Sequence, residues 1–152
     1  MTAQKLIHEL DNTLSGQPWY GSPVLKLIEK VNPENAHTRS CGPHSSADIL
    51  LHMIAWTEET NDRLKGKYAS DPARGDWPDP AHHTWIELNG LFVLCNKHLK
   101  DTVVKMDGAA FSQIVNDDRE DGLAERITYE ELIRGIIQHH VYHSAQIALL
   151  NK

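Results

Sequence analysis

A chain of 152 residues with a formal net charge of −6 at pH 7 can form one hydrophobic core and lacks the basic surface typical of nucleic-acid-binding proteins. No apolar run approaches the roughly 20 residues that a membrane-spanning helix needs, and the N-terminus lacks the apolar core of a secretory signal. Cys41 and Cys95 lie far apart and form no CxxC motif, which excludes a zinc ribbon and makes a disulfide framework unexpected. We therefore expect one cytoplasmic domain over residues 1–152, with no nucleic-acid or membrane partner.

The first third of the chain predicts two helices. Apolar residues at helical spacing indicate a helix from Ala3 to Ser15, which ends before Gly16. Ser22 and Pro23 then begin a shorter helix that runs to about Val31, because proline is well tolerated in the first turn. Proline and glycine residues indicate a loop over residues 32–43.

The rest of the chain predicts three longer helices. One begins at Ser45 or Ser46, each a good N-cap, and runs to Leu64. After a proline- and aspartate-rich connection, the next runs from Pro80 to Val104. The polar residues 106–126 predict a connection with one helical turn near residues 109–115. Thr128 and Glu131 then form a T-x-x-E capping box, which begins a helix that runs to the C-terminus.

Four amphipathic helices of this length are sufficient for an all-α four-helix bundle. The connections after the first long helix and between the second and third are themselves long. Long connections argue against a plain up-down-up-down arrangement.

The C-terminal helix carries two histidines on its predicted core face. His139 and His143 are four residues apart, so their rings lie one above the other and can reach a single metal ion. They belong to a stripe with steps of four, three, four, four and three residues: Leu132, Ile136, His139, His143, Ile147 and Leu150. A polar ring on a buried face needs a partner, which a metal would supply to both.

A metal site needs more than two protein ligands, and His52 is the candidate for the third. It lies beside the apolar residues Ile49, Met53 and Trp56 on its own helix. Three histidines from two helices would leave a coordination position open for water or substrate. The alternative for each ring is a hydrogen-bonded core histidine without metal, and imidazole ligands suit zinc, nickel, iron and copper alike.

Four other residues near these histidines receive weaker assignments. We expect His140, about 100° round the helix from His139, to face the edge of a neighbouring helix or solvent. Glu59, two turns after His52, could approach the site as an acid–base group, but we expect a solvated carboxylate on a charged stretch of surface. Gln146 and Tyr142 could orient the metal-binding histidines by contacting their rings and not the metal itself, although Tyr142 could equally be a packing aromatic.

Five segments carry a distinctive pattern in order along the chain: residues 16–22 (GQPWYGS), 44–45 (HS), 48–58 (DILLHMIAWTE), 76–78 (DWP) and 135–150 (GIIQHHVYHSAQIALL). Together they resemble the DinB-like superfamily of bacterial four-helix metal proteins, including the YfiT-like metal-dependent hydrolases. The resemblance covers nearly the whole chain. Three departures are His140, where the family often has an acidic or amide residue, Ala145, where it often has glycine, and Ala47, where it usually has an aromatic.

The resemblance implies an up-down-down-up bundle that binds zinc or nickel and often forms a homodimer. Carried over residue by residue, the metal triad of the family falls on His52, His139 and His143. The implied function is a metal-dependent hydrolase, or a transferase that uses a low-molecular-weight thiol such as bacillithiol or mycothiol, acting on a small molecule.

The residues themselves favour a metal-bound water or thiol as the nucleophile. The chain has no Gly-x-Ser-x-Gly motif, and neither cysteine lies in an activating motif. The alternative is a non-catalytic protein in which the metal stabilises the fold or serves sensing or dimerisation. The lack of a fourth protein ligand favours the enzyme.

Overall fold

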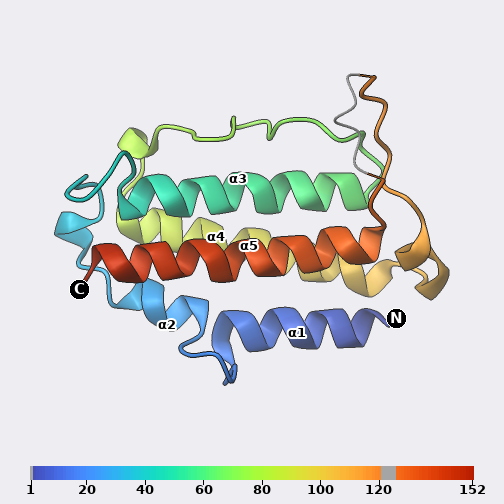
Figure 1. The fold of residues 1–152 in the computed structure, drawn as a ribbon, viewed down its shortest axis with the longest axis horizontal. Helices are drawn as coiled ribbons and strands as arrows, with labels where there is room; N and C mark the ends of the chain where they lie inside the picture. Colours follow the sequence, from blue (N-terminus) through green and yellow to red (C-terminus); the bar gives the residue numbers. More distant parts are fainter. Residues whose placement is uncertain (1, 121–125) are drawn as a thin grey trace.

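The computed structural model describes residues 2–120 and 126–152, and its named elements are all helical. The described residues form five α-helices (Figure 1): α1 (Ala3–Ser15), α2 (Val24–Glu29), α3 (Ser46–Leu64), α4 (Trp85–Lys105) and α5 (Tyr129–Leu150). Three short 3-10 helices accompany them: η1 (Pro33–Asn35), η2 (Pro80–His82) and η3 (Gly108–Ser112). The all-helical fold class is therefore confirmed. The connection predicted over residues 106–126 contains η3, and its residues 121–125 lie outside the described part.

Capping boxes fix where the three longest helices, α3, α4 and α5, begin. The predicted box at Thr128 and Glu131 is present at the start of α5, and Ser45 forms an equivalent box with Asp48 at the start of α3. The expected start at Pro80 was wrong, because α4 begins at Trp85. The Thr84 hydroxyl accepts the backbone N–H of Glu87 at 3.2 Å, and the Glu87 carboxylate accepts the backbone N–H of Thr84 at 2.7 Å. This box satisfies N–H groups that the first turn of a helix cannot pair internally.

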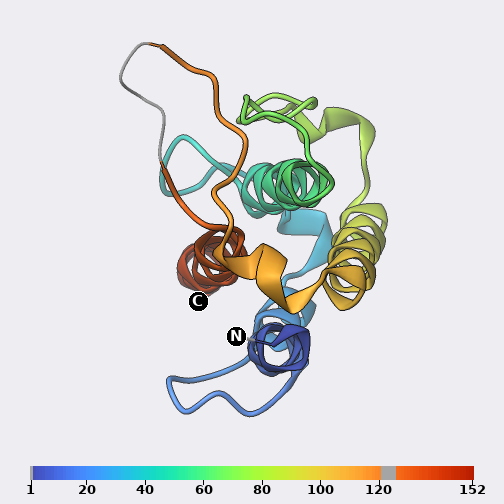
Figure 2. The same ribbon diagram turned by 90° about the vertical axis from the view of Figure 1, so that its right-hand side faces the viewer.

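The long helices lie side by side around a shared core. Seen end-on, α1, α3, α4 and α5 surround the centre of the molecule (Figure 2). α1 and α5 begin at one end of the molecule, whereas α3 and α4 begin at the other (Figure 1). The largest fully buried apolar side chains come mainly from these four helices: Leu6, Leu10, Leu50, Leu51, Met53, Ile54, Leu88, Phe92, Leu99, Ile133 and Ile147, with Phe111 from η3.

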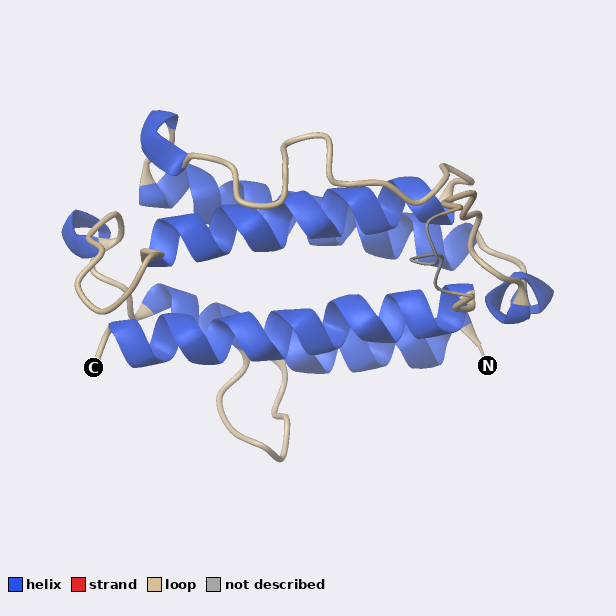
Figure 3. Ribbon diagram, turned by 45° about the horizontal axis from the view of Figure 1, so that its top comes forward, coloured by secondary structure: helices blue, strands red, loops and turns tan. Residues whose placement is uncertain are grey.

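The connection between α3 and α4 covers the outer face of α3. It runs back along the whole length of the helix (Figures 1 and 3). As a result, fifteen of the nineteen residues of α3 are buried, which makes it the central helix. This arrangement carries residues 70–79 over the face of α3 that contains His52.

The same connection explains why the expectation for Glu59 was wrong. Glu59 is buried, with a relative exposure of 2 %. Its carboxylate accepts the Arg63 Nε–H at 2.9 Å, pairs with Lys67 and accepts the backbone N–H of Ser70 at 3.3 Å. A buried carboxylate is tolerable only with such partners; Arg63 comes from α3 itself, and the returning chain adds Lys67 and Ser70. Glu59 therefore pairs with Arg63, Lys67 and Ser70 and not with the histidines.

Within residues 2–120 and 126–152, no helix combines the length and the apolar character that crossing a membrane requires.

Candidate metal centre

The fold brings the three predicted histidines to one point. His52 lies in the first half of α3, and His139 and His143 lie on successive turns of α5. The Nε2 atom of His52 is 3.1 Å from Nε2 of His139 and 3.2 Å from Nε2 of His143. One nitrogen from each ring lies within 4.8 Å of the others, so the group can hold a metal ion. Two of the rings are buried and that of His139 is partly buried.

Hydrogen bonds behind two of these rings determine where their protons lie. His52 Nδ1 is 2.5 Å from the backbone carbonyl oxygen of Asp76, which can only accept, so Nδ1 carries the proton. His143 Nδ1 donates in the same way to Oε1 of Gln146 at 2.6 Å. This contact agrees with the prediction that Gln146 could orient a metal-binding histidine. In the neutral rings, both Nε2 atoms therefore present lone pairs to the shared point.

Burial keeps the three imidazoles neutral. It lowers the pKa of His52 and of His143 below the ordinary imidazole value. Burial, together with the nearby His143 and His52, lowers the pKa of His139 to about 3. At neutral pH the rings are thus in the form that a metal requires.

The spacing of the nitrogens also fits a metal ion. With metal–nitrogen distances of about 2.0–2.1 Å, two ligands lie about 2.9 Å apart at a right angle and about 3.4 Å apart at a tetrahedral angle. The observed 3.1 and 3.2 Å fall between these values. Two lone pairs facing each other at 3.2 Å repel unless a cation lies between them. The donor set and its geometry therefore suit a divalent metal.

Asp76 and Trp77 belong to the site but were not predicted as site residues. The indole of Trp77 stacks on the His52 ring at a centroid distance of 3.9 Å, and His44 stacks on the same indole at 3.7 Å. The side chain of Asp76 accepts the Trp56 Nε1–H at 2.7 Å and lies 3.3 Å from His52 Nδ1. The only sequence signal was the Asp-Trp-Pro run at residues 76–78, because a loop leaves no periodicity to interpret.

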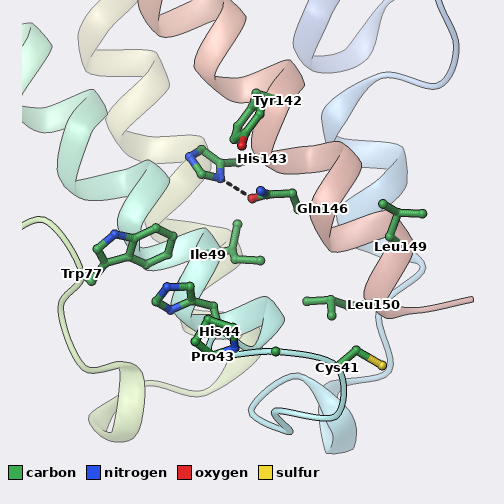
Figure 4. Close-up of a pocket in the computed structure, with 11 residues that line it drawn as sticks. Cys41, Pro43, His44, Ile49, Trp77, Tyr142, His143, Gln146, Leu149 and Leu150 are labelled. Atoms are coloured by element: carbon green, nitrogen blue, oxygen red, sulfur yellow. Dashed lines mark hydrogen bonds between the residues drawn. The ribbon is translucent and has the colours of Figure 1, made fainter.

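A cavity of about 450 Å³ opens beside His143. Its lining residues come from the loop before α3, the start of α3, the connection after it and the last turns of α5 (Figure 4): Cys41, Gly42, Pro43, His44, Ile49, Trp77, Tyr142, His143, Gln146, Leu149 and Leu150. Tyr142 is exposed and meets the His143 ring edge-on at 4.9 Å. A separate pocket of about 190 Å³ reaches His139 from the other side, near Trp56 and Arg63.

Of the two environments expected for His140, the structure shows the neighbouring helix and not solvent. Its ring is fully buried, and its Nε2 atom is 2.9 Å from Oδ1 of Asn96 on α4. Asn96 donates its amide to the Phe92 carbonyl at 3.0 Å, so Oδ1 faces the histidine as an acceptor. Burial lowers the pKa of His140 to about 3. α4 packs near this face of α5, which the spacing of one helix could not reveal.

The comparisons with known proteins agree with the geometry. A family model described as the DinB superfamily matches residues 22–147, which is most of the chain and includes all three histidines. Searches of curated proteins and of solved structures found no match.

Proposed function

Because the chain belongs to the DinB superfamily, whose members bind metals, we propose that His52, His139 and His143 hold a divalent ion, zinc or nickel, in a metal-dependent enzyme. The enzyme is a hydrolase or a low-molecular-weight-thiol-dependent transferase that acts on a small molecule. One observation carries the proposal. The Nε2 atoms of His52 and His143 face each other at 3.2 Å, while Asp76 and Gln146 hold the ring protons on the opposite nitrogens.

A divalent metal held by neutral imidazoles lowers the pKa of a bound water or thiol toward neutrality, which makes it a nucleophile at pH 7. The residues of the chain supply the rest. Asp76 and Gln146 orient the rings of His52 and His143. Trp77 stacks on the His52 ring and forms a wall of the cavity. Three protein ligands leave a position for a reacting group, and the cavity beside His143 gives a small molecule a route to it.

The proposal also covers the helix topology, the number of domains, the oligomeric state and the cellular location. The opposite directions of α1 and α5 against α3 and α4 support an up-down-down-up four-helix bundle (Figure 1). The extent of the family match supports one domain over the chain. A homodimer, a cytoplasmic location and the lack of a nucleic-acid partner stay predictions from the sequence.

The test is to measure metal content and turnover together. Purified wild-type protein should contain one zinc or nickel ion per chain by elemental analysis, and His143→Ala should lose it while its circular dichroism stays helical. His98→Ala, at an exposed histidine on α4, is the matched control and should keep the metal. Metal-loaded protein should catalyse a reaction in a screen of ester and amide hydrolysis and of thiol transfer, and His143→Ala should not.

The outcomes separate the two candidate functions. Wild-type protein that takes up no zinc or nickel would contradict the metal site itself. Protein that binds the metal but turns over nothing, with and without added thiols, would contradict the enzyme and leave the non-catalytic module, in which the metal joins α3 to α5.

A further inference from the structure

We propose that the cavity beside His143 takes an uncharged, largely apolar small molecule and selects against carboxylates and phosphates. The inference rests on the proposed function in one respect, since it takes this cavity as the substrate site. The cavity shares His143 with the histidine cluster, so a molecule bound in it lies next to the cluster (Figure 4). Its volume of about 450 Å³ falls within the usual range for small-molecule sites.

The walls of the cavity are mainly apolar and carry no fixed charge. Large apolar surfaces come from Pro43, Ile49, Trp77, Leu149 and Leu150. None of the described residues that line the cavity is Asp, Glu, Lys or Arg. An ionised group moved from water into such surroundings loses its hydration and gains no counter-charge. Sites that bind carboxylates or phosphates usually offer an arginine or lysine.

Two charged groups near the lining residues, Arg39 and Asp76, give an anion in the cavity no free counter-charge. Arg39, two residues before Cys41, donates from Nε and from one terminal nitrogen to the two carboxylate oxygens of Asp48, each at 2.9 Å. Its charge is therefore already paired. Asp76, next to Trp77, adds a negative charge 3.3 Å from His52 Nδ1. In the metal-free chain, these two groups therefore do not favour a second anion.

The polar groups of the cavity suit a neutral ligand. Gln146 uses its amide oxygen to accept from His143, which leaves its NH₂ group as a donor at the cavity wall. The ring of His44, held against Trp77, adds a second polar edge. A neutral molecule with an apolar body and one carbonyl or hydroxyl oxygen would match these surfaces.

The test compares two probes that differ in charge: methyl 4-methylbenzoate and 4-methylbenzoate. Binding is followed by NMR through the Trp77 indole and the Gln146 side-chain amide. The chain is first made metal-free so that no bound cation attracts the carboxylate. We expect the ester to bind at least about tenfold more tightly than the carboxylate. Equal or tighter binding of the carboxylate overturns the proposal, as does the failure of both probes to shift these resonances.

Two matched variants locate the selectivity. Leu149→Arg places a cation at the cavity from a side chain that is 64 % exposed, and it should reduce or reverse the preference for the ester. Val104→Arg adds the same charge in the last turn of α4, a helix that contributes no residue to the cavity lining, at a position 63 % exposed, and should leave the preference unchanged. An unchanged preference in Leu149→Arg contradicts the assignment of this cavity.

The result can be distinguished from a failure of the proposed function. A chain that prefers the ester but binds no zinc or nickel keeps the selective cavity and loses the metal enzyme. A chain that binds the metal through the three histidines but prefers the carboxylate when metal-free keeps the metal site and loses the inference.

Discussion

Zinc should stabilise the folded chain against heat through the three histidines. In the metal-free protein, the neutral rings of His52 and His143 direct lone pairs at each other over 3.2 Å, and an ion between them converts this repulsion into two bonds. A ligand at 100 times its dissociation constant stabilises the native state by about 2.7 kcal/mol. For a chain of this length, each kcal/mol raises Tm by about 2–4 °C. The expected increase is therefore about 5–11 °C.

Differential scanning calorimetry of EDTA-treated protein, with and without zinc, measures this increase. His143→Ala removes one of the facing nitrogens and should lose most of the increase, whereas His98→Ala on the exposed face of α4 should retain it. The reasoning would be refuted if His143→Ala and wild-type protein showed the same increase, because the stabilising ion would then bind elsewhere.

Three further predictions concern groups around the site and at the helix ends. Gln146→Leu removes the acceptor that orients His143 and should weaken zinc binding about 10–100-fold in a chelator competition, and an unchanged affinity would exclude this role. Asn96→Leu leaves the buried N–H of His140 unpaired and should cost about 1–3 kcal/mol in urea unfolding; His140→Phe added to it should recover part of that loss, and no recovery would count against the hydrogen bond. Burial raises the pKa of Asp48, but hydrogen bonds led by those from Arg39 outweigh it and lower the pKa to about 2. Because the unfolded pKa is about 3.9, this carboxylate should contribute about 2.5 kcal/mol above pH 4, lost as the pH falls toward 2, and Asp48→Asn should flatten that part of the stability profile.

The sequence alone determined the helices and the three histidines. Apolar spacing and the Thr128–Glu131 capping box are local signals, because a helix depends on residues three and four apart. The same spacing placed His139 and His143 on one face of α5. It also placed His52 on an apolar face of α3 as the candidate third ligand, and the family resemblance fell on the same residue.

Only the tertiary structure decided what surrounds those histidines. His140 is buried because Asn96 and Phe92 on α4 pack against it, and the order of apolar residues in α5 does not record which helix lies beside it. Asp76 and Trp77 reach His52 because their connection folds back along α3. Such contacts join residues 24 or more positions apart, so they depend on how the chain packs and not on any local pattern. The sequence thus determined which side chains could bind a metal, and the packing decided their protonation, their orientation and the cavity beside them.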